Sequence, residues 1–299
     1  MVRFILNGEN VEYDGDGTQT LLMWLRFTAD MKSVKDGCSG EGTCGACLVE
    51  MDGKPMLSCS IKMERMEGRS VVTLEGIPDE IRTTLGRAFV ASGAVQCGFC
   101  SPGMLMRAKI LLTNNPNPTR EEVTKAIRHH ICRCTGYIKI VDAILLGAER
   151  LQTKEPIVFE GGRLGKSTPK HSAYERAIGK PLFIGGMDNP SDMLHGQLCF
   201  SDHPRAKILK IDVSKAEAME GVVRVFGAND VPGTRNVGHL IKDWDIYIAE
   251  GETTRCTGDV LACVVAESKP IAEAAAKLVE IEYEVLEPLT DPFVVMNSD

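Results

Sequence analysis

The sequence lacks an excess of positive charge, a long apolar run and a signal-like beginning. Its 34 lysines and arginines are outnumbered by 41 acidic residues, and the resulting charge of −7 argues against a nucleic-acid partner or a membrane surface. No apolar run approaches the roughly 18 residues that span a membrane. Met1–Gly8 turns polar too early for a signal peptide. We therefore expect a cytoplasmic protein with no nucleic-acid and no membrane partner.

Cysteine is the informative residue. The hydrophobic share of 43% and the charged share of 25% are ordinary for a globular protein, so wholesale disorder is excluded. A length of 299 residues suffices for two or three domains. Eleven cysteines are present, and eight of them precede residue 135. Such clustering in a chain without a signal favours metal ligation over disulfides.

Residues 1–76 are predicted to form a small β-rich domain. Asn7-Gly8 is a strong two-residue hairpin signal between two short apolar runs. A helix is expected where apolar residues repeat with helical spacing. The expected elements are the strands Val2–Leu6, Val11–Tyr13, Leu48–Met51 and Val71–Leu74, the helix Thr20–Ala29, and a return strand that carries Cys59.

The first set of candidate metal ligands is Cys38, Cys44, Cys47 and Cys59. Three lie on one glycine-rich loop, and the fourth lies on a neighbouring strand. A 2Fe–2S cluster needs four thiolates and a chain that wraps closely around them, which small residues permit. Five residues separate Cys38 from Cys44, one more than in the plant-type spacing. A four-cysteine zinc site is the alternative, although zinc ribbons usually pair two C-x2-C knuckles.

Residues 77–152 change to helical periodicity. Asn114–Pro118 interrupts the pattern, and Thr119–Glu122 is a capping box that opens the next helix. The four predicted helices cover Ile81–Ala91, Ser101–Leu112, a segment beginning at Thr119, and Ile138–Leu151. Four helices of these lengths indicate a compact bundle.

The second set of candidate ligands, Cys97, Cys100, Cys132 and Cys134, lies where these helices start and end. Backbone N–H groups at helix N-termini stabilise anionic sulfur. A C-x-C pair is unusual for zinc but suits two ligands that share one iron. Taken alone, Cys97 and Cys100 could form a redox dithiol. Their occurrence together with the second pair favours a second 2Fe–2S cluster instead.

Three motifs resemble the iron–sulfur region of the xanthine dehydrogenase/aldehyde oxidoreductase family of molybdenum hydroxylases. They are Gln96–Met104 (QCGFCSPGM), Asn115–Thr119 (NPNPT) and Ile131–Tyr137 (ICRCTGY). The resemblance covers essentially residues 1–150. It implies a β-grasp ferredoxin domain and a four-helix domain, each with one 2Fe–2S cluster. It also implies that Cys134 lies against the amino group of a molybdopterin and that Gln96 faces the pterin. Electrons would pass from molybdenum through the helical cluster to the ferredoxin cluster.

Residues 153–180 are predicted to be an aperiodic linker, and residues 181–299 an α/β domain. Strands are expected at Ile208–Val213, Val222–Phe226, Val260–Ala266 and Glu280–Val285, with helices at Lys215–Met219 and Ile271–Val279. Motifs such as Ser201–Ile208 and Gly258–Ala262 resemble the hammerhead domain of the same family. Cys199, Cys256 and Cys263 have no metal spacing and are expected to be small buried residues. The overall prediction is an α+β multidomain protein.

The resemblance also implies what surrounds these domains. The family's molybdopterin-binding domains would be a partner chain or a further part of this polypeptide, so no catalytic residue is assigned here. Direct fusion of the iron–sulfur and hammerhead parts implies that FAD is on a separate subunit. Ile241–Glu252 resembles the selenium-dependent xanthine dehydrogenase branch, which implies a purine substrate such as xanthine. The alternatives are an aldehyde oxidoreductase, a free-standing 2Fe–2S electron carrier, or a zinc-stabilised scaffold.

Overall fold

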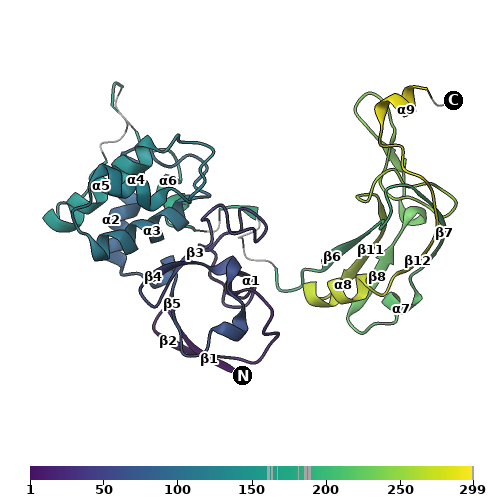
Figure 1. Ribbon diagram of the computed structural model, residues 1–299, viewed down its shortest axis with the longest axis horizontal. Coiled ribbons are helices and arrows are strands. Elements are labelled where there is room, and N and C mark those ends of the chain that lie inside the picture. Colours follow the sequence, from purple (N-terminus) through teal and green to yellow (C-terminus); the bar gives the residue numbers. More distant parts are fainter. Residues whose placement is uncertain are drawn as a thin grey trace. The chain divides into compact units, whose positions relative to one another are not determined.

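The chain divides into two compact units, Met1–Asp188 and Asn189–Asp299. The computed structural model describes residues 1–297 with the exception of 160, 161, 163, 167, 181, 185, 186, 188 and 189. Figure 1 shows a sheet followed by a group of helices in the first unit, and mostly strands in the second. No described helix is both long enough and apolar enough to cross a membrane.

The first unit opens with a five-stranded sheet in the order β2-β1-β5-β3-β4. Its antiparallel hairpin turns at Asn7 and Gly8, whose φ angles of 52° and 91° explain why this dipeptide stands there. β1 and β5 run parallel, as a β-grasp arrangement requires. The elements are β1 (Val2–Leu6), β2 (Glu9–Tyr13), α1 (Leu21–Phe27), β3 (Leu48–Met51), β4 (Lys54–Leu57) and β5 (Ser70–Val72).

The predicted position of Cys59 on a strand is wrong. β4 ends at Leu57, and Cys59 lies in the short 3₁₀ helix Ser58–Ser60 that follows it. The Ser58 hydroxyl donates to the Cys47 carbonyl at 2.8 Å, and the Ser58 backbone N–H donates to the same oxygen at 3.2 Å. These two bonds turn the chain back toward the cysteine loop, so that Cys59 faces Cys47.

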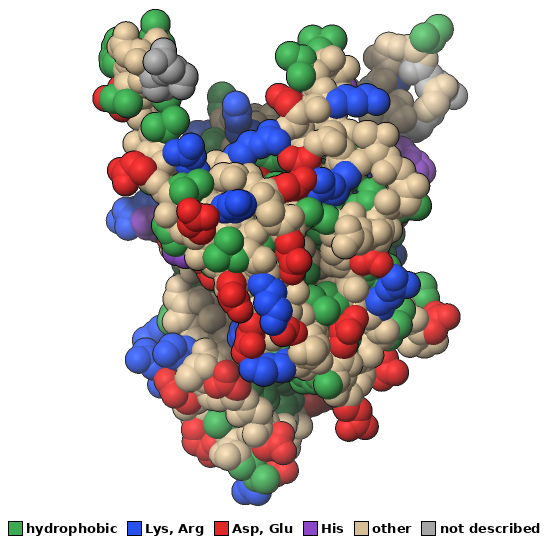
Figure 2. Space-filling model, turned by 90° about the vertical axis from the view of Figure 1, so that its right-hand side faces the viewer, with side chains coloured by type: hydrophobic (Ala, Val, Ile, Leu, Met, Phe, Trp, Pro, Cys, Tyr) green, Lys and Arg blue, Asp and Glu red, His purple; other side chains and the backbone are tan. Residues whose placement is uncertain are grey.

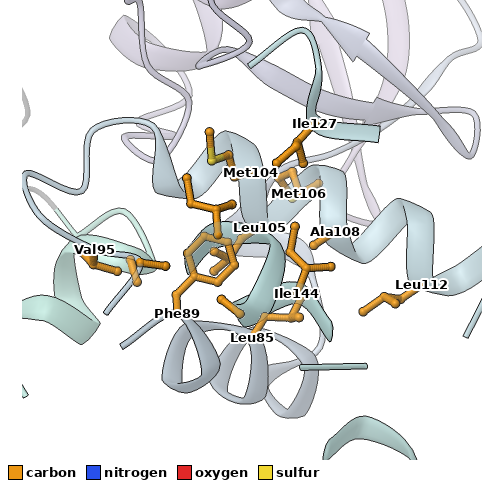
Figure 3. Close-up of a cluster of buried hydrophobic side chains, with 14 of the residues drawn as sticks. Leu85, Phe89, Val95, Met104, Leu105, Met106, Ala108, Leu112, Ile127 and Ile144 are labelled. Atoms are coloured by element: carbon orange, nitrogen blue, oxygen red, sulfur yellow. The ribbon is translucent and has the colours of Figure 1, made fainter. Parts of the chain in front are cut away.

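Four helices then form a bundle: α2 (Asp79–Ala91), α3 (Ser101–Asn114), α4 (Arg120–Ile127) and α5 (Ile138–Thr153). Thr119 and Glu122 make the predicted capping box at the start of α4. Leu85 and Phe89 of α2, Leu105 of α3 and Ile144 of α5 meet in the middle of the bundle (Figure 3). All four are fully buried. This core therefore fixes the positions of the helix ends, and with them the cysteines at those ends.

A fifth helix corrects the prediction of an aperiodic linker. α6 (Ala173–Ala177) lies inside the segment 153–180 and places Ala173 and Ala177 in the core of the bundle. Tyr174 and Ile178 pack against Gly86 of α2, where a Cβ would lie 2.9 Å from Ile178. Sequence periodicity does not reveal α6 because a five-residue helix is too short to show a repeat.

The second unit has a three-stranded antiparallel sheet, β6-β11-β8, and a two-stranded antiparallel sheet, β12-β7. The sequence pattern does not predict β6. The apolar side chains of Leu198 and Phe200 lie on the exposed side of this strand, so the alternation of apolar and polar residues does not mark its buried side. The elements are β6 (His195–Phe200), β7 (Ala206–Asp212), α7 (Ser214–Glu217), β8 (Val222–Phe226), β9 (Asn236–Val237), β10 (Trp244–Asp245), β11 (Val260–Ala266), α8 (Lys269–Ala276), β12 (Glu280–Val285) and α9 (Pro292–Met296).

The core of the second unit lies between the helices α7 and α8 and the larger sheet. Ala216 of α7 and Ala275 of α8 are buried against Val264 of β11. Acidic and basic side chains are interspersed over the molecular face seen in Figure 2. This mixture agrees with the modest net charge of −7.

Replacing Phe89 by alanine should lower the free energy of unfolding of the helical bundle by about 3–5 kcal/mol, because the change leaves a cavity in a closed core. Phe89 is 0% exposed, whereas Phe27, the matched control, is 57% exposed at the end of α1. Phe27→Ala should change the free energy of unfolding by less than about 0.5 kcal/mol. Urea titration followed by circular dichroism measures both, and equal losses in the two variants would contradict this description of the core.

Candidate metal centres

The first set of cysteines lies on the loop between α1 and β3 and on the turn after β4. Cys44, Cys47 and Cys59 are buried, and Cys38 is half-buried. The sulfurs meet as two pairs, in which the thiol of Cys38 hydrogen-bonds that of Cys44 and the thiol of Cys47 hydrogen-bonds that of Cys59. The structure therefore brings the four cysteines of the predicted set together as two sulfur pairs.

The surroundings of the two pairs differ electrostatically. Burial acts to raise the pKa of Cys38, but hydrogen bonds from the backbone N–H groups of Thr43 and Cys44 outweigh it and lower this pKa to about 7. Burial raises the pKa of Cys47 to about 12, and its neighbour Cys59 acts in the same direction through the side chain. The backbone N–H groups of the loop thus stabilise a thiolate at Cys38, whereas Cys47 favours the neutral thiol unless a bound cation stabilises its anion.

The second set lies at the helix ends of the bundle. Cys100 immediately precedes α3, and Cys132 and Cys134 lie between α4 and α5. These sulfurs also meet as pairs: Cys134 Sγ lies 3.6 Å from Cys97 Sγ, and the thiols of Cys100 and Cys132 hydrogen-bond each other. Burial raises the pKa of Cys100, and the adjacent Cys132 raises it further.

Polar groups hold the second set in place. The Cys132 backbone N–H donates to the Tyr137 hydroxyl at 2.9 Å, and the Thr135 hydroxyl lies 3.2 Å from Cys132 Sγ. The amide of Gln96 donates to the Cys134 carbonyl at 2.9 Å. Gln96 and Cys134, which the sequence analysis assigned to one pterin-facing surface, are therefore direct neighbours.

Pairs of thiols suit irons that each take two cysteine ligands. Two sulfurs about 2.3 Å from one tetrahedral metal are roughly 3.7 Å apart, and the 3.6 Å between Cys97 and Cys134 matches that separation. A zinc site would draw three or four ligands around one centre. Among the described residues, no group of three or more His, Cys, Asp or Glu side chains is arranged to hold a single metal ion. The chemistry and spacing of the donors fit 2Fe–2S clusters.

The two sets adjoin each other. The Ile131 backbone N–H donates to the Cys44 carbonyl at 3.0 Å, one residue before Cys132. Gly45 lies so close to His130 that a Cβ would be 2.6 Å from its Nδ1. His130 is 4% exposed, and burial lowers its pKa to about 4, with the positive charge of Arg107 acting in the same direction, so the ring is neutral at pH 7. His130 cannot be recognised from the sequence, because nothing in the local sequence shows its contact with Gly45.

The three remaining cysteines lie in the second unit, away from both sets along the chain. Cys199 is buried on β6 as expected. Cys256 and Cys263 are only half-buried, which corrects the expectation that they are buried. The Cys256 thiol is 3.6 Å from Asp259 Oδ1, a local contact within one turn.

A β-grasp sheet and a helical bundle, each carrying two pairs of cysteine thiols, define an iron–sulfur protein with two cluster-binding domains. Family comparisons give the same class. Residues 4–69 match the 2Fe-2S iron-sulfur cluster binding domain, and residues 73–145 match a second 2Fe-2S binding domain. Residues 179–287 match the a/b hammerhead domain of aldehyde oxidase and xanthine dehydrogenase.

Individual relatives show which kinds of iron–sulfur protein this chain is similar to. The chain is 44% identical over 146 residues to the nicotinate dehydrogenase small FeS subunit of Eubacterium barkeri, covering 48% of this chain and 92% of that subunit. It is 36% identical over 284 residues to the aldehyde oxidoreductase of Megalodesulfovibrio gigas, covering 88% of this chain and 31% of the relative. The crystal structure of the aldehyde oxidoreductase from Desulfovibrio desulfuricans superposes with a TM-score of 0.83 at 36% identity, covering 100% of this chain and 35% of that one.

The chain belongs to the molybdenum hydroxylase family. It carries the family's two 2Fe–2S cluster-binding domains and its hammerhead domain. It spans about a third of the length of the aldehyde oxidoreductases that it matches.

In the folded, metal-free chain, iodoacetamide should alkylate Cys38 well before Cys47 at neutral pH. A pKa of about 7 leaves a large thiolate fraction on Cys38, whereas a pKa of about 12 leaves Cys47 almost entirely protonated. Quantitative peptide mass spectrometry after a short exposure measures both rates. Raising the pH from 6 to 8 should convert most of Cys38 to thiolate, whereas Cys47 stays almost entirely protonated and slow to react. Equal rates in the folded chain would show that the loop does not stabilise the Cys38 thiolate.

Proposed function

We propose that this chain is the iron–sulfur electron-transfer portion of a molybdenum hydroxylase. In this proposal, electrons leave a molybdenum–molybdopterin site, pass through the helical cluster and then the ferredoxin cluster, and reach a flavin or another acceptor. The observation that carries the proposal is the arrangement of eight thiols in two adjoining sets of two pairs. Two such centres close together allow an electron to pass from one cluster to the other.

The residues proposed to hold the clusters are Cys38, Cys44, Cys47 and Cys59 in the first domain and Cys97, Cys100, Cys132 and Cys134 in the second. When bound, each cluster accepts and returns one electron. The protein keeps the sets adjacent through the hydrogen bond from Ile131 to the Cys44 carbonyl. We retain 1–76 and 77–152 as the two cluster domains and 181–299 as the hammerhead domain, and we add α6 to the helical domain because its alanines lie in that core.

Gln96 and Cys134 are proposed to face the pterin. Gln96 is exposed, and its amide is held on the Cys134 carbonyl, so both residues reach the same surface. Ile138 and Tyr137 expose apolar side chains close by in sequence, at the start of α5. An exposed glutamine and a half-buried cysteine beside exposed apolar side chains suit a face that a partner domain covers.

The other parts of the enzyme are proposed from the same comparisons. A molybdopterin-binding chain or domain would pack on the hammerhead domain, FAD would be on a separate subunit, and the substrate would bind to the partner. The resemblance of Ile241–Glu252 favours a purine such as xanthine. Similarity to aldehyde oxidoreductases over 88% of this chain favours an aldehyde as the second candidate. Eight cysteines kept for metal binding fit a cytoplasmic location.

The native complex tests this proposal. Purified protein should contain molybdenum, about four irons per chain, and two distinct EPR signals after reduction. Turnover with xanthine or with an aldehyde then separates the two substrate candidates. A colourless complex with stoichiometric zinc would contradict the electron-transfer function, and a monomer that carries electrons without a molybdenum partner would contradict the assignment to a hydroxylase.

Cys134→Ser should remove or alter the EPR signal of the helical cluster and slow substrate-driven reduction, because one thiolate ligand is lost. The signal of the ferredoxin cluster should persist, since its four cysteines are intact. Cys256→Ser is the matched control and should leave both signals unchanged, because Cys256 lies in the second unit and contacts Asp259. Equal loss of both signals in Cys134→Ser would contradict the assignment of ligands to two separate clusters.

A further inference from the structure

The segment that contains α6 covers the loop that carries Cys97 and Cys100. We call residues 170–180 the strap. Lys170 Nζ donates to the Gln96 carbonyl at 2.7 Å, and Arg176 Nη1 donates to the Cys97 carbonyl at 3.3 Å. Gly98 is so close to the strap that a Cβ would lie 2.5 Å from Arg176 Cβ. The strap therefore places a guanidinium against the backbone of the helical cluster loop.

A second contact, besides the hydrogen bond to the Cys97 carbonyl, positions the Arg176 side chain. Its Nε is buried and has no hydrogen-bond partner among the described residues. Its guanidinium carbon lies 5.9 Å from the centre of the Phe183 ring. Arg176 is half-buried as a residue, and its guanidinium carries a permanent positive charge.

A second cation reaches the same place from the ferredoxin domain. Lys35 precedes Cys38 by three residues, yet its side chain is directed to the other cysteine set. Its Nζ lies 5.3 Å from the centre of the Phe99 ring, and Phe99 stands between Cys97 and Cys100. Phe183 packs against Phe99 at 5.7 Å, and the same Nζ lies 4.8 Å from the Phe183 ring. Two aromatic faces thus enclose the ammonium.

Burial of Lys35 is almost complete. The residue is 6% exposed, and Nζ has no hydrogen-bond acceptor among the residues that the structure describes. Burial lowers the pKa of Lys35 to about 8, with Arg26 acting in the same direction, whereas Cys97 and Cys100 as anions act to raise it. At pH 7 the lysine is therefore protonated, and the anionic groups that favour its charge are two cysteines of the helical set.

We propose that Lys35 and Arg176 set the reduction potential of the cluster held by Cys97, Cys100, Cys132 and Cys134. Reduction adds one electron and no proton, so the cluster becomes more negative by one charge. The buried Lys35 ammonium and the half-buried Arg176 guanidinium stabilise this reduced form more than the oxidised form. Charges separated by about 10 Å in a protein interior still interact appreciably. The inference rests on the proposed electron-transfer function.

A higher potential of the helical cluster changes how electrons are distributed between the two clusters. Positive charge beside the helical cluster raises its potential, so it favours removal of electrons from the pterin side. Lys35 belongs to the ferredoxin domain, whereas Arg176 lies in α6 of the helical domain. Both charges are therefore in place only when α6 is folded into the bundle and the ferredoxin domain packs on it.

EPR-monitored redox titration of the complete enzyme tests the proposal, with dithionite as reductant and ferricyanide as oxidant. Lys35→Met and Arg176→Gln should each lower the midpoint potential of the helical cluster, shifting its oxidised-to-reduced ratio at a fixed potential on the order of tenfold, which is about 59 mV for one electron. The ferredoxin cluster should shift less. Arg176→Lys, which keeps the charge, should restore most of the potential.

Lys154→Met is the matched control, because Lys154 is an exposed cation paired with Glu80 at the end of α5, and it should leave both potentials unchanged. If Lys35→Met fails to assemble, the Arg176 pair of variants decides the question. Two intact EPR signals with unchanged midpoints in Lys35→Met or Arg176→Gln would overturn this inference alone. Absence of two signals in the wild-type enzyme would instead overturn the proposed function.

Discussion

The close contact between Gly45 and His130 is the constraint on which the arrangement of both metal centres depends. Gly45 lies between Cys44 and Cys47, and His130 lies two residues before Cys132. No side chain fits at Gly45, because a Cβ would be 2.6 Å from the imidazole. Because the loop that carries Gly45 approaches His130 this closely, the Ile131 N–H reaches the Cys44 carbonyl. The two domains are therefore fixed to each other at their cysteine loops.

Packing on the other side of the same loop reinforces this constraint. Gly103 in the first turn of α3 faces Gly45, and a Cβ on it would lie 2.5 Å from the Gly45 carbonyl oxygen. The buried core of the bundle fixes α3, because Leu105 packs against Phe89. Displacement of α3 would therefore disturb Cys100 at its N-terminus and the ferredoxin loop together. Stability of the bundle and geometry of both cysteine sets depend on the same packed helices.

Electrostatics follows from this packing. Thiols that meet in pairs in a buried place repel each other when ionised, and burial raises the pKa of Cys47 and Cys100. Cations at the metal positions relieve this repulsion within each pair, whereas Lys35 and Arg176 act from outside the helical set. The strap is thus part of the electrostatic environment of the second set as well as a connection to the hammerhead domain.

Local spacing and turn chemistry predicted the two cysteine sets, the β-hairpin at Asn7-Gly8, the capped helix at Thr119 and most strands of the hammerhead domain. These signals require no knowledge of distant residues. Four features could be established only from the folded chain: which sulfurs meet, that Cys59 lies on a turn, that α6 belongs to the bundle, and that Lys35 reaches Phe99. Each of these features depends on packing that brings residues far apart in the chain into contact. Local periodicity does not indicate such contacts.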